Sequence, residues 1–351
     1  MNQRLPARTT LHLRAGAVLA ATCLLLTACA TTTQPSAEEQ TSKQPSDSAS
    51  CRGDASTSTS SGPVTLTDDF GRTVKLKKPA QRVVVLEWQQ IEDVLSLCLT
   101  PVGVADAKGY RLWDTAEELP SGVKDVGQRG EPNLDALFST NPDLVVVELA
   151  GKDDPIVKRL AKYDVPVVAT AGADAEDPIA KMKRTLSLLG KATGREEQAT
   201  AVNDQFDTHL AAAKEKLASA DLPTRDFLYF DAYVEGGNVS IRPFGQGSLM
   251  GELGEALGLD NAWTGKVDPV YGLGQTDIEG MTKVGDATLL HTGTVDDGGK
   301  ASKALDTNKI WRSLPAVSEK RYRAFPSGVW TFGGPRSAEQ ALDAYVDLMT
   351  S

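Results

Sequence analysis

The stretch that decides the fold is residues 82–113, which read RVVVLEWQQIEDVLSLCLTPVGVADAKGYRLW. The β-branched run at 82–87 predicts a buried strand, and apolar residues at helical spacing over 90–98 predict a helix. Residues 101–105 predict a second buried strand. A strand, a helix and a strand in this order indicate two parallel strands with the helix packed on one face of their sheet.

The same alternation continues along the rest of the chain. Strands are predicted at 143–148, 165–170, 227–232, 238–242, 287–292 and 322–326, and helices at 133–140, 154–163, 248–258, 277–284 and 337–349. A chain of this length exceeds one typical hydrophobic core. We therefore expect an α/β fold with two Rossmann-like lobes, each a mostly parallel sheet flanked by helices.

Residues 195–219 differ from both halves, because one narrow apolar stripe runs along an otherwise polar segment. The stripe consists of Ala199, Val202, Phe206, Leu210, Ala213 and Leu217. A helix of this length spans roughly 37 Å, which is enough to join two lobes. The predicted organisation is an N-terminal lobe at 63–173, connecting helices at 174–222 and a C-terminal lobe at 223–351.

The N-terminus carries a targeting signal. Residues 1–28 combine three Arg with a short apolar run and end in Leu-Thr-Ala before Cys29, which is typical of a lipoprotein signal peptide. Cleavage before Cys29 and acylation with two chains would anchor the protein to the extracytoplasmic face of a membrane. Residues 29–62 are rich in Ser, Thr, Pro and Gln and predict a disordered tether.

Charge and cysteine usage narrow the class of protein. The formal net charge is -10, and the predicted signal peptide contains no acidic residue, so the mature chain is strongly acidic and is not expected to bind nucleic acid. Cys51 and Cys98 remain after processing. The compartment permits a disulfide between them, but a buried free thiol suits the apolar segment around Cys98 equally well.

Large aromatic residues and one Arg follow the predicted strands. They are Trp88, Tyr110, Trp113 and Arg129 in the first half and Tyr271, Trp330 and Phe332 in the second. A single loop aromatic usually covers the core, but a set drawn from both lobes favours a binding cleft at the strand ends. Aromatic faces suit a large apolar ligand, and an Arg donates paired hydrogen bonds to partly charged oxygens.

Other functional classes find little support. The chain has three His, no His and carboxylate cluster, and no nucleophile with a matching base. We expect neither catalytic residues, nor a protein-bound metal, nor a cofactor. A lipid-anchored enzyme is a remote alternative. A haem or cobalamin-like ligand is a nearer one, and a haem would take Tyr271 or His291 as its axial residue.

Five segments resemble the class III (helical-connector) substrate-binding proteins of ABC importers, in particular those that bind ferric hydroxamate siderophores. They are YRLW (110–113) followed by DVGQRGEPNLDAL (125–137), FGQGSLMGELGEALGLDNAW (244–263), KIWRSLPAVSEKRY (309–322) and VWTFGG (329–334). The resemblance covers essentially the whole folded region. It implies a monomeric binding protein that delivers a ferric siderophore to an ABC permease, with iron enclosed by its own ligand.

The resemblance also implies roles for single residues. Trp113 and Arg129 match residues that contact the hydroxamate, and Trp330 and Tyr271 match aromatic residues of the cleft. Phe332 stands where the family has Tyr. The family's Tyr after the third strand has no counterpart, because this chain reads ELAG at 148–151.

Two acidic residues, Asp135 and Glu279, lie at predicted helix starts, one in each lobe. Acids at this position ordinarily stabilise the helix dipole. The family's lobe acids, which these two residues match, meet the permease, and the resemblance therefore favours a docking role for both.

Overall fold

The computed structural model describes residues 51, 60–295 and 298–351. The predicted signal peptide, Cys29 and most of the predicted tether therefore lie outside the described residues. In the described part of the chain, no helix combines the length and the apolar character that crossing a membrane requires.

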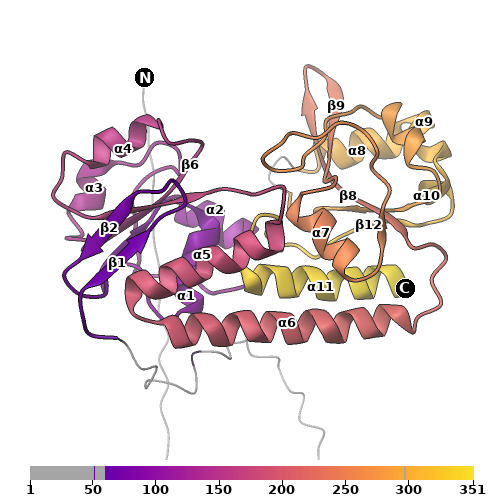
Figure 1. The fold of residues 1–351 in the computed structure, drawn as a ribbon. Coiled ribbons are helices and arrows are strands. Elements are labelled where there is room, and N and C mark those ends of the chain that lie inside the picture. Colours follow the sequence, from indigo (N-terminus) through magenta and orange to yellow (C-terminus); the bar gives the residue numbers. More distant parts are fainter. Residues whose placement is uncertain (1–50, 52–59, 296–297) are drawn as a thin grey trace, which may run out of the picture. The chain divides into compact units, whose positions relative to one another are not determined.

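The first sheet begins with two strands from residues 82–113. Its strand order is β5-β4-β3-β6-β7, and all neighbouring strands are parallel. The strands are β3 (Val83–Val85), β4 (Gly103–Val104), β5 (Lys124–Asp125), β6 (Leu144–Leu149) and β7 (Val167–Ala171). Helices α1 (Trp88–Ser96), α2 (Ala107–Trp113), α3 (Leu134–Phe138) and α4 (Pro155–Leu160) alternate with them. The predicted parallel strand–helix–strand unit is confirmed (Figure 1).

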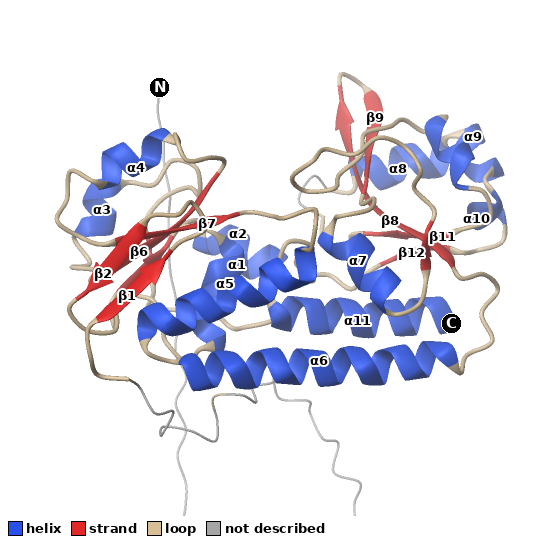
Figure 2. Ribbon diagram, viewed as in Figure 1, coloured by secondary structure: helices blue, strands red, loops and turns tan. Residues whose placement is uncertain are grey.

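The second sheet repeats this design with one antiparallel addition. Strands β8 (Asp226–Glu235), β10 (Asp260–Asn261), β11 (Thr288–His291) and β12 (Tyr322–Ala324) form the order β10-β8-β11-β12, and all of these pairs are parallel. Strand β9 (Asn238–Pro243) pairs with β8 in the antiparallel sense. Several helices flank this sheet (Figure 2). They include α7 (Leu249–Ala256) and the short helices α8 (Lys300–Thr307), α9 (Lys309–Ser313) and α10 (Pro315–Ser318).

Each sheet has a hydrophobic core on both faces, which explains why its strands read as continuous apolar runs. In the first sheet, Val83 and Val85 pack toward α1, whereas Val84 and Val145 pack toward α3 and α4. In the second sheet, one core contains α7 and the other contains α8 and α9. Two cores for each sheet confirm the predicted α/β class with two lobes.

The predicted long helix is α6 (Glu196–Ala218), and α5 (Pro178–Thr193) precedes it. The apolar stripe of α6 reaches both lobes, because Ala199 and Val202 belong to a core of the first lobe, whereas Phe206 and Leu217 belong to a core of the second. The C-terminal helix α11 (Pro335–Thr350) packs along α6. The connection is therefore a layer of packed helices of which α6 is the longest.

Two local expectations differ from the structure. Residues 110–113 form the end of α2 and not a loop, because the Asp106 side chain accepts a hydrogen bond from Gly109 N and starts a short helix. The helix expected at 90–98 ends at Ser96, and Cys98 adopts a left-handed conformation with φ of 59°. The strands β1 (Val64–Thr67) and β2 (Thr73–Leu76), which form an antiparallel hairpin, were not predicted.

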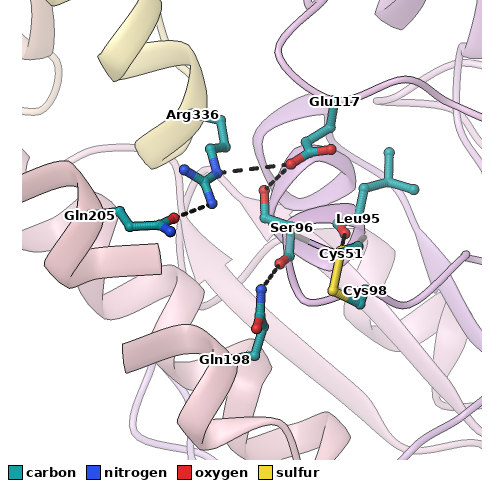
Figure 3. Close-up of a disulfide and its surroundings, with 8 residues drawn as sticks. All are labelled: Cys51, Leu95, Ser96, Cys98, Glu117, Gln198, Gln205 and Arg336. Carbon is teal, nitrogen blue, oxygen red and sulfur yellow. Dashed lines mark hydrogen bonds and ion pairs between the residues drawn. A yellow bond between two sulfur atoms is a disulfide. The ribbon is translucent and has the colours of Figure 1, made fainter. Parts of the chain in front are cut away.

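The sequence alone did not decide whether Cys51 and Cys98 pair. In the structure they form a disulfide. It lies beside the end of α1, next to a set of polar contacts that tie α1 to the connecting helices (Figure 3). The Gln198 side chain on α6 donates to Ser96 O at 3.0 Å, and Ser96 Oγ donates to Glu117 at 3.3 Å. A covalent bond and buried hydrogen bonds thus hold the same end of α1.

Candidate ligand-binding site

A cleft of about 380 Å³ opens where strand ends of both lobes face each other. Its lining is aromatic and charged, and it consists of Glu87, Arg129, Glu148 and Gly172 from the first lobe with Arg242, Tyr271, Leu273, Trp330 and Phe332 from the second. Four residues predicted for the site line it, namely Arg129, Tyr271, Trp330 and Phe332. Parallel sheets place ligands at this position because the loops after their strands converge there.

Arg129 is held at the cleft by an ion pair and by stacking. Its guanidinium pairs with the carboxylate of Glu87, the residue that caps the start of α1. The guanidinium carbon lies 3.8 Å from the Trp88 ring centroid and 5.8 Å from that of Trp330. An Arg stacked and paired in this way is fixed in orientation, and its remaining N–H groups can donate to ligand oxygens.

Aromatic rings continue from the first lobe across to the second. The Trp330 ring lies 4.8 Å from Trp88, 6.0 Å from Trp113 and 5.4 Å from Phe332, all near edge-on. Phe332 in turn lies 5.8 Å from Tyr271. Such edge-to-face contacts fix the rings, so a large apolar ligand meets a surface that loses little entropy on binding.

Three predicted site residues do not line this cleft. Trp88 is buried and forms the floor under Arg129. Trp113 touches Trp330 but faces a neighbouring hollow that Asp231 and Tyr233 also line. Tyr110 is fully buried, and its hydroxyl donates to Glu117 O at 2.8 Å, so it belongs to the core of the first lobe. Its place at an inner turn of α2, rather than in a loop, is the reason.

The second Arg of the cleft is also paired with an acid. Arg242 on β9 forms an ion pair with Asp231 on β8, and its guanidinium lies 5.8 Å from the Phe332 ring. The two residues are direct neighbours in the β8–β9 register. Burial raises the pKa of Asp231, and the charge of Arg242 opposes this shift. Each guanidinium of the cleft is therefore balanced by one carboxylate.

Sequence reasoning missed Glu148 as a site residue. It lies near the end of β6, and its carboxylate accepts a hydrogen bond from the Tyr271 hydroxyl of the opposite lobe at 3.2 Å. Burial raises the pKa of Glu148 to about 7, and the nearby charge of Glu87 adds to the shift. The sequence does contain one sign of this role, because Glu148 is the single acid in the otherwise apolar strand VVVEL. Burying a charge is costly, so an acid at such a position often has a functional role.

The structure describes no metal-binding cluster, since no group of three or more His, Cys, Asp or Glu among the described residues is arranged to hold a metal ion. His291 closes β11, and its Nδ1 lies 2.8 Å from Thr292 O. Burial lowers its pKa, and it lines the neighbouring hollow rather than the cleft.

The two predicted docking acids are both exposed. Asp135 lies in the first turn of α3, as expected. Glu279 differs slightly, because it precedes a 3-10 helix, η1 (Gly280–Val284), rather than lying inside an α-helix. Neither side chain forms an ion pair with another described residue, so both can contact a partner.

The fold and this cleft define a class of protein. Two mostly parallel sheets joined by a long helix, with an aromatic cleft at their facing strand ends, make a substrate-binding protein of the helical-connector type. The chain belongs to the periplasmic binding protein family, whose profile matches residues 83–327. This family consists of substrate-binding proteins and not of enzymes, so the expectation of a non-catalytic chain holds.

The relatives of this chain are named for different types of iron complex. The chain is 28% identical over 258 residues to the iron(3+)-hydroxamate-binding protein FhuD of Escherichia coli (strain K12), covering 73% of this chain and 83% of the relative. It is 30% identical over 223 residues to the ferric enterobactin-binding protein FepB of Escherichia coli O6:H1, covering 61% and 66%.

A solved structure supports the fold. The siderophore-binding protein FhuD from Vibrio cholerae, with Fe3+-Desferal bound, matches with a TM-score of 0.65 at 24% identity. The match covers 77% of this chain and 98% of that chain. The resemblance inferred from the motifs is thereby confirmed at the level of family and fold.

Proposed function

We propose that this chain is the substrate-binding lipoprotein of an ABC importer and that it binds a ferric siderophore of the hydroxamate type for iron uptake. The observation that carries this proposal is the charge balance of the cleft. Arg129 is paired with Glu87 and Arg242 with Asp231, so the cleft offers aromatic surface without a surplus of cations. Ferric hydroxamates are neutral or weakly cationic and suit such a site, whereas ferric catecholates are strongly anionic and would require unpaired cations.

Percentage identity does not separate these ligand classes, because this chain is 28% identical to FhuD and 30% identical to FepB, although the match to FhuD covers more of both chains. The paired arginines favour the hydroxamate. A haem ligand is less well supported, since His291 lies outside the cleft and the Tyr271 hydroxyl is engaged by Glu148. Cleavage before Cys29 and acylation there would keep the protein at the extracytoplasmic face of the membrane, where Asp135 and Glu279 would dock onto the permease.

Tryptophan fluorescence tests the proposed ligand. Titration with a neutral ferric trihydroxamate should quench the emission strongly, because Trp330 lines the cleft and the rings of Trp88 and Trp113 pack against Trp330. A ferric tris-catecholate, haem and cobalamin serve as competitors in the same assay. Saturable quenching by the tris-catecholate alone, with none by hydroxamates, would overturn the hydroxamate assignment.

A pair of Trp variants assigns the signal to the cleft. Trp330→Phe should remove a large part of the quenching. Trp311→Phe should not, because Trp311 is buried in the second lobe against Phe230 and Tyr322. Circular dichroism verifies that both variants are folded. Equal quenching in the two variants would place the ligand away from this cleft.

A further inference from the structure

One carboxylate of the cleft has no cationic partner. Among the described residues, the acids Glu87 and Asp231 each form an ion pair with an Arg of the cleft, whereas no Lys or Arg forms an ion pair with Glu148. Its carboxylate accepts hydrogen bonds from the hydroxyl of Tyr271 and the side-chain amide of Gln90, both of which are neutral. The cleft therefore contains two Arg–carboxylate ion pairs and one acid, Glu148, that lies outside these pairs.

The Lys residue whose charge acts on Glu148 is engaged elsewhere. Lys181 on α5 acts on Glu148 only at a distance, and its ammonium lies 3.1 Å from Asp69 and 2.6 Å from the Thr185 hydroxyl. The other charged or titratable groups around Glu148 in the cleft are Glu87, Tyr271 and the two arginines, which are paired with Glu87 and Asp231. Glu87 repels a second negative charge, and Tyr271 donates one hydrogen bond. Hydrogen bonds from Gln90 and Tyr271 and the distant charge of Lys181 favour the ionised form of Glu148, but none of these described groups forms an ion pair with it.

The backbone is shaped to keep this acid and the Tyr hydroxyl together at the cleft. A Cβ atom at Gly172, just after β7, would lie 2.0 Å from the Tyr271 hydroxyl oxygen and 2.4 Å from Glu148 Oε1. Any larger residue would push the two groups apart. The absence of a side chain at Gly172 therefore permits the contact between the lobes and leaves the carboxylate at the wall of the cleft.

A partly buried acid with a pKa of about 7 responds strongly to a cation. Burial and Glu87 disfavour its ionised form, and a positive charge placed beside it would reverse both effects. An anionic group at the same place would add a third negative charge. The site therefore discriminates between ligands by the charge that they bring to this wall.

We propose that Glu148 is a specificity-determining residue that selects ferric siderophores bearing a protonated primary amine, whose ammonium group binds at its carboxylate beside Glu87. The inference rests on the proposed function, since it names the subclass of ferric hydroxamate that the same cleft prefers. Arg129 keeps Glu87 occupied, so Glu148 remains the acid that the ammonium would neutralise.

The experiment compares two ligands that differ only in this charge: ferrioxamine B, which carries a free amine, and its N-acetylated derivative, which is neutral. Wild-type protein should bind the amine form about tenfold more tightly, the lower end expected for a hydrogen bond between charged groups. Glu148→Gln keeps the size of the side chain and an acceptor for Tyr271, and it should bring the ratio of the two affinities close to unity. Glu176→Gln, which removes an exposed acid in the loop after β7, should leave the ratio unchanged.

The pH dependence provides a second readout. Protonation of Glu148 should reduce the preference for the amine form as the pH falls from about 8 to about 6, because the acid loses its charge around its pKa of about 7. The affinity for the acetylated ligand should change little over this range.

The outcomes distinguish the two proposals. If neither ferric hydroxamate binds the wild-type protein, the proposed function itself fails. If both bind, but with equal affinity or with a ratio that Glu148→Gln does not alter, the hydroxamate function stands and the selection by Glu148 is refuted.

Discussion

The carboxylate of Glu92 on α1 lies 2.6 Å from the hydroxyl of Ser337 in the first turn of α11. It also accepts hydrogen bonds from the main-chain N–H groups of Gly334, Arg336 and Ser337 at 2.9 to 3.0 Å. A side chain of the first lobe thus satisfies the N-terminal amides of the C-terminal helix, which lack partners within the helix itself. This buried contact couples α1 to the helical layer that connects the lobes.

Replacing this cap should destabilise the protein. Glu92→Met fills a similar volume but accepts no hydrogen bond, and it leaves several buried N–H groups of α11 unsatisfied. We expect the free energy of unfolding to fall by about 1–3 kcal/mol, the cost of such groups. Unfolding in guanidinium chloride, monitored by circular dichroism, measures this free energy. An unchanged midpoint would mean that water or a rearranged backbone replaces the carboxylate.

The neighbouring Asp93 should have the opposite effect at neutral pH. Its two carboxylate oxygens are buried and have no hydrogen-bond partner among the described residues. Burial, and next the charge of Glu92, raise its pKa well above the ordinary value. Asp93→Asn removes the buried charge, and it should stabilise the protein at pH 8 by about 1–3 kcal/mol.

The pH dependence of this effect has a defined sign. A carboxyl group whose pKa is higher in the folded state binds more protons there than in the unfolded chain, so its contribution to stability falls as the pH rises through that interval. The advantage of Asp93→Asn should therefore be largest above the raised pKa and disappear near the ordinary carboxyl pKa of about 4. A constant difference from pH 4 to pH 8 would contradict a raised pKa of Asp93 in the folded protein.

The disulfide between Cys51 and Cys98 should contribute to stability through the unfolded chain. Their sequence separation is 47 residues, and a closed loop of this size restricts the unfolded ensemble. Cys51→Ser should lower the free energy of unfolding by about 2–4 kcal/mol. Adding a reductant should destabilise the wild-type protein to the same degree and leave Cys51→Ser unaffected. A response of the variant to reductant would point to a different source of the effect.

Arg129 should contribute to ligand affinity through the geometry of its guanidinium. Arg129→Ala should weaken ferric hydroxamate binding by about 1.5–3 kcal/mol, the range for a hydrogen bond from a charged group, and it also leaves Glu87 without its cation. Arg129→Lys retains the charge but loses the planar stacking on Trp88, so it should restore only part of the affinity. Calorimetric titration distinguishes the three proteins. Full affinity in folded Arg129→Ala would argue against a pose that uses this residue.

The two exposed acids should matter for transport and not for ligand capture. The double variant Asp135→Ala and Glu279→Ala should bind the ferric siderophore with unchanged affinity, because neither residue lines the cleft. Uptake of radiolabelled iron by cells that carry it should fall markedly if the acids dock onto cationic residues of the permease. Normal uptake by the double variant would refute docking through this pair.

Much of the fold was accessible from local patterns, because strands with buried faces and helices with apolar stripes leave periodic signals in the chain. The strands around Val84 and Leu289 and the stripe of α6 were predicted close to their observed bounds. The β1–β2 hairpin was not, since each of its strands is only four residues long. Tyr110 was misplaced because a short helix of seven residues carries too weak a periodicity to be separated from a loop.

The amino-acid sequence by itself determined the two α/β lobes, the long connecting helix and most of the aromatic and Arg residues at the cleft, because the apolar periodicity of strands and helices is a local property of the chain. Only the tertiary structure decided how charges are paired. It placed Arg129 against Glu87, Arg242 against Asp231 and Glu148 against Tyr271. Two of these contacts join residues far apart in the chain, and their energies depend on distance and burial. No local pattern contains either quantity.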